Sequence, residues 1–276
     1  MKLFSCWVLI LFYLKESFCS VTYEGIGTFG NFDFYHPIYR PFTFFFKPDP
    51  PEEIVPTFTL YTRSNPHAPE TLIWNDTASL LNSKYFNSSL KTKVLIHGFL
   101  ENSAFNPVRW LHKTKTKLLN SGDYNVILVD WDKGSKIIYD KAVLNARVIG
   151  PMIAIQIQRL CDVYANTTLA DFHLISFSLG CHVAGYAGKF LEGKLGWITG
   201  LDPSRPLFEG LQPEAYLYYT DASFVEILHT DSRLLIGLGF SEPTGKIDIF
   251  INNGKGQPGC WTERFNSYKQ PDIFSG

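Results

Sequence analysis

The residues best suited to chemistry form the short motif Ser176-Phe177-Ser178-Leu179-Gly180. An apolar run typical of a buried strand precedes this motif, and small residues compatible with a helix follow it. A strand that turns sharply into a helix exposes its central serine at the helix N-terminus, where the next backbone N–H can stabilise an oxyanion. The turn requires small residues two positions either side of the serine, and Ser176 and Gly180 are small, although Ser176 stands where glycine is usual. The motif therefore indicates a nucleophile elbow, with Ser178 as nucleophile and Leu179 as an oxyanion donor.

Two other strand ends carry groups that this chemistry needs. Asp202 closes the apolar run 197–199 and is followed at once by Pro203. An acid at a strand end after the nucleophile fits the chain order of serine, acid and histidine in α/β-hydrolases. Upstream, the short apolar run 93–96 leads through Gly98 to Phe99, whose backbone N–H is suited to be the second oxyanion donor.

The elements that must position these groups alternate between strand and helix patterns. Strands are expected at 57–62, 94–96, 125–131, 171–177, 197–201, 224–230 and 247–251, and helices at 110–119, 139–164 and 179–191. Gly150-Pro151 predicts a kink or two shorter helices within 139–164. The alternation predicts an α/β-hydrolase fold, with a mostly parallel sheet and helices on both faces.

Further segments support a family resemblance. They are 58–62, 126–131, 221–231 and 253–260. Together with the elbow and the other two strand ends, they make the chain resemble the catalytic domain of the pancreatic-lipase family from about residue 58 to about residue 260. The stretch 241–245 looks closer to the phospholipase A1 branch of that family. The resemblance implies a carboxylic ester hydrolase that releases fatty acid from a triacylglycerol or phospholipid at an interface, with Ser178 and Asp202 as catalytic residues.

The catalytic histidine is the missing part of this constellation. Chain order places the base after Asp202, yet the only later histidine is His229, in a strand-like segment that does not correspond to the family's base. In the family the base follows the second cysteine of a disulfide-closed lid, and Cys260 matches the first. We therefore expect residues 20–276 to be a lipase-type domain truncated within the lid. His182 and His229 remain alternative bases, His173 is expected to pack within the sheet, and His97 is expected to brace the oxyanion loop.

The first residues predict secretion. Lys2 precedes the apolar run 4–14, and small residues suit cleavage before Ser20, so residues 1–19 are expected to be a signal peptide. A run of that length is well short of the roughly 20 residues that span a bilayer, so no transmembrane anchor is expected. In a secreted chain Asn75, Asn87 and Asn166 are glycosylation acceptors.

The cysteines of the mature chain are Cys161, Cys181 and Cys260. The strand expected between the first two holds them roughly 20 Å apart, too far for a disulfide, so both are expected to be free thiols. Cys260 then remains as half of a bridge.

Composition and motifs exclude several other functions. A net charge of -1 and the absence of a basic cluster make nucleic acid an unsuitable partner. No metal-ligand or phosphate-loop motif is present, so no cofactor is expected. Some relatives hold a structural calcium after the acid, but the stretch 213–221 has only two carboxylates and no arginine, which argues against calcium here. The alternative to an esterase is a non-catalytic lipase-like protein that binds lipid or serves as a yolk or storage protein.

Overall fold

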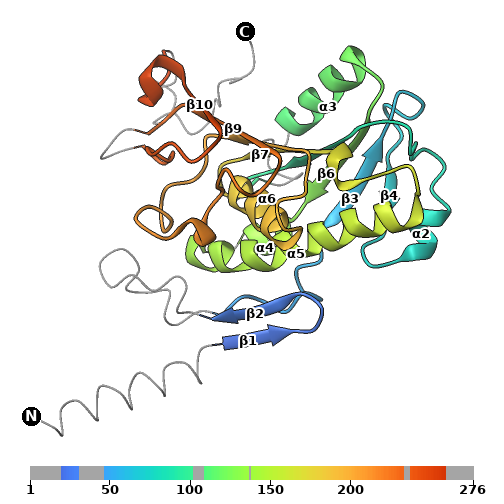
Figure 1. Cartoon of the computed structure of the whole chain (residues 1–276), viewed down its shortest axis with the longest axis horizontal. Coiled ribbons are helices and arrows are strands. Elements are labelled where there is room, and N and C mark those ends of the chain that lie inside the picture. The colour runs from blue at the N-terminus through green and yellow to red at the C-terminus, as the bar shows by residue number, and fades with distance from the viewer. Residues whose placement is uncertain (1–19, 31–46, 102–108, 137, 233–236, 259–276) are drawn as a thin grey trace, which may run out of the picture.

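A computed structural model describes residues 20–30, 47–101, 109–136, 138–232 and 237–258 (Figure 1). Its main sheet has eight strands in the order β10-β9-β8-β7-β5-β6-β3-β4. The strands are β3 (Thr57–Tyr61), β4 (Glu70–Leu72), β5 (Thr92–Ile96), β6 (Asn125–Asp130), β7 (Phe172–Phe177), β8 (Trp197–Leu201), β9 (Phe224–His229) and β10 (Ile247–Phe250). Neighbours from β6 to β10 pair in parallel, whereas β3 pairs antiparallel with both β4 and β6.

Helices cover both faces of this sheet, which confirms the predicted α/β-hydrolase fold. Helices α5 (Tyr139–Val163) and α6 (Leu179–Phe190) pack together on one face, and α3 (Arg109–Ser121) covers the other (Figure 1). Each face has its own apolar cluster, because the central strands are buried on both sides. Strand β6 shows this directly, since its residues 125–129 are all buried.

Helix α5 continues as one helix through Gly150 and Pro151, so of the two expected outcomes, a kink or two shorter helices, the second is wrong. The explanation lies in its packing against α6. A Cβ atom on Gly150 would lie 2.4 Å from the Cβ of Tyr186, so the glycine lets the two helices approach closely. The burial gained along this contact offsets the one helical hydrogen bond that a proline cannot donate.

Smaller elements were not predicted from the sequence. Strands β1 (Ser20–Tyr23) and β2 (Gly27–Gly30) form an antiparallel hairpin. Ile26, between these strands, is buried in the larger core cluster. The short helices α2 (Thr77–Leu81) and α4 (Asp132–Ser135) complete the α-helices of the described chain, which also has the 3₁₀ helices Leu169–Asp171, Pro213–Ala215 and Ile251–Gly254.

Candidate active site at the carboxyl edge of the sheet

The sheet brings the three predicted strand ends to one edge. Strand β7 pairs in parallel with both β5 and β8, and Phe177 at the end of β7 lies opposite Leu201 at the end of β8. Ser178 and Asp202 each follow one of these paired residues directly. Phe99 follows the end of β5 by three residues, so all three groups lie at the carboxyl edge of adjacent strands.

Ser178 has the strained backbone expected of a nucleophile elbow. It is the N-cap of α6, with φ 53° and ψ -122°, a conformation that glycine adopts more readily than serine. Its backbone N–H donates to the carbonyl of Leu201 at 3.0 Å, which ties the elbow to β8. A Cβ on Gly180 would lie 2.3 Å from the carbonyl oxygen of His97, so glycine is required for the helix to start this close to β5. The side chain of Ser176 is fully buried and donates to the carbonyl of Thr199 at 3.1 Å, which accommodates serine at the usual glycine position.

Asp202 is held in place by the strand beside it. Its Oδ1 accepts hydrogen bonds from the backbone N–H groups of Thr230 at 2.9 Å and Asp231 at 3.1 Å. Burial raises the pKa of the Asp202 carboxyl, and the backbone donors oppose that rise. The carboxylate is therefore oriented at the sheet edge without an ion pair to any described residue.

The two predicted oxyanion donors are not used inside the described part of the fold. The backbone N–H groups of Phe99 and Leu179 donate to none of its residues, and the Ser178 hydroxyl has no hydrogen bond there either. Leu179 is the first residue of α6, so its N–H belongs to the positive end of the helix dipole. Among the described residues, nothing competes with a ligand for these groups.

His97 holds the loop that carries Phe99. Its Nδ1 lies 2.8 Å from the carbonyl oxygen of Gly98, and its Nε2 accepts the backbone N–H of Trp131 at 3.0 Å. Oδ1 of Asp130 also lies 3.3 Å from Nε2, so the ring has partners on both nitrogens. His97 is fully buried, as expected of a brace for this loop.

Two residues that the sequence analysis missed also shape this edge. The Glu101 carboxylate accepts from the backbone N–H of Gly98 at 2.7 Å and from Nε1 of Trp110 at 3.3 Å. The Tyr139 ring packs edge-on against Phe99, and its hydroxyl lies 2.6 Å from Oγ of Ser204. Tyr139 lies 65 residues from Ser204, so no local pattern identifies its contact, whereas Glu101 lies only three residues from Gly98 and its contact depends on how that loop folds.

The two histidines that were alternative bases both have partners on their two ring nitrogens. Nε2 of His182 lies 2.7 Å from the carbonyl oxygen of Ser204, and its Nδ1 accepts the N–H of Leu217 at 3.2 Å. His229 contacts the carbonyl of Phe240 through Nδ1 at 2.9 Å and the carboxylate of Asp248 through Nε2 at 2.7 Å. Both rings are buried, so neither has a free nitrogen for the Ser178 hydroxyl.

The remaining described histidines lie toward the opposite edge of the sheet. His173 pairs with Trp197 at the start of β8, stacks on its ring and lies 2.7 Å from the hydroxyl of Thr199. Burial and the nearby Lys93 lower the pKa of His173 to about 3. His112 packs on Tyr61, and Tyr61 pairs with Val126 near the start of β6. His67 follows the end of β3, which runs antiparallel to β6.

The other predicted sites have mixed outcomes. Cys161 and Cys181 are free thiols, as predicted, whereas Cys260 and the lid lie outside the described residues. Asn75, Asn87 and Asn166 are all exposed. In the part of the chain with assigned positions, no three metal-ligating side chains gather. No helix found there is long and apolar enough to cross a membrane.

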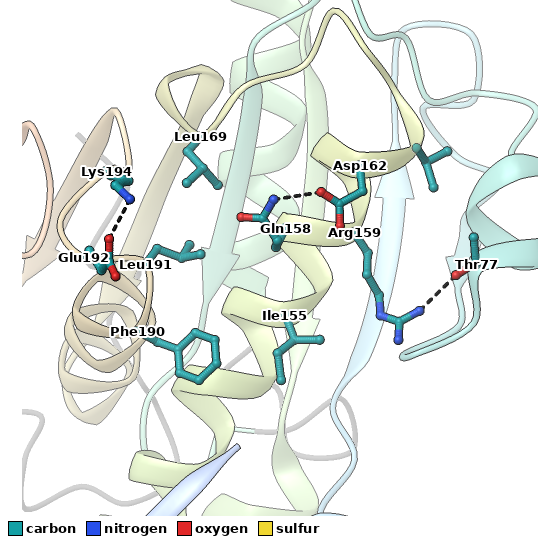
Figure 2. Close-up of a pocket in the computed structure, with 11 residues that line it drawn as sticks. Thr77, Ile155, Gln158, Arg159, Asp162, Leu169, Phe190, Leu191, Glu192 and Lys194 are labelled. Atoms are coloured by element: carbon teal, nitrogen blue, oxygen red, sulfur yellow. Dashed lines mark hydrogen bonds and ion pairs between the residues drawn. The ribbon is translucent and has the colours of Figure 1, made fainter. Parts of the chain in front are cut away.

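A surface pocket of about 690 Å³ is lined by none of the candidate active-site residues (Figure 2). It is lined by the C-terminal parts of α5 and α6, including Ile155, Arg159 and Phe190. Phe190 ends the helix that Ser178 begins, and twelve residues of helix span about 18 Å. This pocket therefore does not serve the elbow.

Comparison with known proteins agrees with this geometry. The chain matches the Lipase family over residues 19–270. It is 39% identical to mouse pancreatic lipase-related protein 2 over 259 residues, covering 92% of this chain and 52% of that protein. It is 39% identical to lipase member H-A of Xenopus laevis over 204 residues, 73% of this chain and 42% of that protein. It is also 38% identical to the dog protein named inactive pancreatic lipase-related protein 1 over 261 residues, 93% of this chain and 54% of that protein.

The chain thus spans about half the length of the curated relatives that it matches. The family match covers the elbow, the acid and the oxyanion loop alike. The chain belongs to the Lipase family.

Proposed function

We propose that this protein is a carboxylic ester hydrolase that releases fatty acid from glycerolipids. The observation that carries the proposal is the strained Ser178 at the start of α6, beside Asp202 on the neighbouring strand end. A backbone in this conformation persists only where the surrounding structure holds it, and such residues cluster at functional sites. The family relationship supports ester hydrolysis as the chemistry.

In the proposed reaction the Ser178 hydroxyl attacks the ester carbonyl carbon. The carbonyl oxygen becomes an oxyanion, which accepts hydrogen bonds from the N–H groups of Phe99 and Leu179. A histidine takes the serine proton and transfers it to the leaving alcohol, while Asp202 orients that histidine. Water then attacks the acyl-enzyme and passes a proton to the same histidine, which returns it to the Ser178 oxygen as the acyl–oxygen bond breaks and the fatty acid is released.

We propose that residues C-terminal to Gly276 supply this histidine. Each described histidine is either bonded through both ring nitrogens or lies toward the opposite edge of the sheet. The serine hydroxyl is far from ionised at neutral pH, so it is a weak nucleophile without a base. Residues 20–276 are accordingly proposed to be a lipase-type domain that ends within the lid.

A lipid substrate suits the surface around the site. Leu100 is 52% exposed, Ile138 is 50% exposed and Leu238 is 59% exposed. Leu100 follows Phe99 directly, Ile138 precedes Tyr139, and Leu238 accepts a backbone hydrogen bond from Arg205 in the loop after Asp202. Apolar side chains at the rim can contact an aggregated lipid without a basic patch.

The proposal places this reaction outside the cell. Residues 1–19 would act as the signal peptide, and Asn75, Asn87 and Asn166 would carry glycans, for which their exposure is suitable. Phospholipid and triacylglycerol are both acyl esters of glycerol, and the substrate test below separates them.

A second candidate function is non-catalytic lipid binding. The observation that favours it is that His182 and His229 use their ring nitrogens in other hydrogen bonds. Ser178 therefore has no proton acceptor in the described chain. In that case the elbow would be a retained backbone feature, and the protein would bind lipid without turnover.

The test uses the protein translated from a transcript that continues past the codon for Gly276. We expect it to hydrolyse trioleoylglycerol emulsions or phosphatidylcholine vesicles, and the preferred lipid identifies the substrate class. Ser178→Ala should abolish the activity, and Asp202→Asn should reduce it by about 10⁴-fold, because asparagine favours the wrong imidazole tautomer. Lipid binding without hydrolysis by the unaltered protein would favour the second candidate.

A further inference from the structure

The loop 213–221 lies in the stretch where some relatives hold a calcium ion. In this chain, oxygen atoms of the loop contact the ammonium group of Lys189 instead. Lys189, near the end of α6, places Nζ 2.7 Å from the carbonyl oxygen of Tyr216 and 2.6 Å from Oδ2 of Asp221. The Asp221 side chain is only 1% exposed, and that of Lys189 is 26% exposed. A positive charge therefore sits among the inward-facing oxygens of the loop.

The loop closes tightly around this charge. Oδ2 of Asp221 also accepts the backbone N–H of Tyr218 at 2.9 Å, and the N–H of Asp221 donates to the carbonyl of Tyr218 at 3.0 Å. A Cβ on Gly188 would lie 2.2 Å from the carbonyl oxygen of Asp221, so the helix and loop backbones are in direct contact. The hydroxyl of Tyr186 donates to the carbonyl of Ala215 at 2.5 Å and fixes the start of the loop.

These residues do not fit a calcium ion. Calcium requires six to eight oxygen ligands at about 2.3–2.6 Å. Two oxygens of this loop, from Tyr216 and Asp221, already contact the ammonium group of Lys189. The loop's other carboxylate, Glu214, is exposed, and no cluster of three ligating side chains is found among described residues. A calcium ion bound to the same oxygens would also lie within a few ångströms of the ammonium charge, which would repel it.

We propose that the Lys189 ammonium is the chain's own cation for loop 213–221, replacing a divalent metal ion and making the loop independent of calcium. The attachment stabilises the segment that leads from the acid Asp202 into strand β9. This attachment requires a positive charge at the position of the Lys189 ammonium group, because its acceptors are one carbonyl and one buried carboxylate.

Thermal unfolding at neutral pH tests this proposal. The melting temperature of the unaltered protein should be the same in millimolar calcium chloride and in chelator. Lys189→Met should lower it by about 10 °C, because removing one partner leaves the buried Asp221 charge unpaired. Lys194→Met is the matched control: Lys194 pairs with Glu192, but both side chains are mostly exposed, so the melting temperature should hardly change.

Calorimetric titration of the unaltered protein with calcium chloride provides a measurement that does not depend on the variant folding. We expect the unaltered protein to show no heat of calcium binding that disappears in the Asp221→Asn variant. Calcium binding that Asp221→Asn removes, a melting temperature lowered by chelator, or a Lys189→Met protein as stable as the unaltered one would each overturn the proposal.

Discussion

Helix α6 has Ser178 as its N-cap and Lys189 in its last turn, and its two ends use their polar groups differently. At the N-terminal end the hydroxyl of Ser178 and the N–H groups of Phe99 and Leu179 have no partner in the described chain. At the C-terminal end Lys189 and the Asp221 carboxylate are joined to each other and to backbone groups. Unused donors and a strained backbone suit catalysis, whereas paired buried groups hold a loop.

A single helix can carry a reactive group at its N-terminus and a structural ion pair at its C-terminus. The sheet edge constrains the N-terminal end, and loop 213–221 covers the C-terminal end. Stability and chemistry are then separable by mutation along a single element. The following predictions test that separation.

The larger effect is expected at the C-terminal end, as a pH dependence of stability. Burial raises the pKa of Asp221 to about 6 despite the attraction of Lys189. The folded state then binds this proton more tightly than the unfolded state does, so the contribution of Asp221 is greatest below its unfolded pKa of 3.8 and is lost as pH rises through about 6. The free energy of unfolding of the unaltered protein minus that of Asp221→Asn should therefore fall between pH 4 and pH 7, by no more than about 3 kcal/mol.

Urea unfolding of the two proteins at several pH values measures this difference. All other titrating groups are shared, so they largely cancel in the subtraction. A difference that rises with pH would show that pairing with Lys189, rather than burial, dominates the pKa of Asp221.

The smaller effect is expected at the N-terminal end, where Ser178→Gly should increase stability. Glycine adopts the backbone conformation of residue 178 without the penalty of a Cβ, which costs about 1 kcal/mol or more at such positions. Ser178→Ala is the control, because it removes the hydroxyl but keeps the Cβ. In urea unfolding we expect the glycine variant to be more stable than the alanine variant by about 1 kcal/mol. This is a net gain, because the greater entropy of the unfolded glycine variant offsets part of the relief of strain. Equal stability of the two variants would mean that the elbow stores no strain.

The sequence was sufficient to place the elbow and the acid at strand ends, because small residues around Ser178 and the Asp202-Pro203 step are local signals. The order of parallel strands then brought them to one edge. The Lys189–Asp221 pair was not predictable in the same way, since its partners are 32 residues apart and meet only when the loop folds over α6. The expectation of two shorter helices at Pro151 was wrong for a similar reason, because the close approach of Gly150 to Tyr186 is a tertiary contact.

The central proposal is that Ser178 is the nucleophile and that the described residues do not supply its base. The measurement is hydrolysis of a short fluorogenic ester by the 276-residue protein, with and without added imidazole, beside Ser178→Ala as control. We predict a rate near that of the control without imidazole, and a rate increase with imidazole that exceeds the increase seen for the control, because a free imidazole can accept the serine proton. Rapid turnover without imidazole that is abolished by Ser178→Ala would contradict the account, since a residue of the chain itself would then be acting as the base.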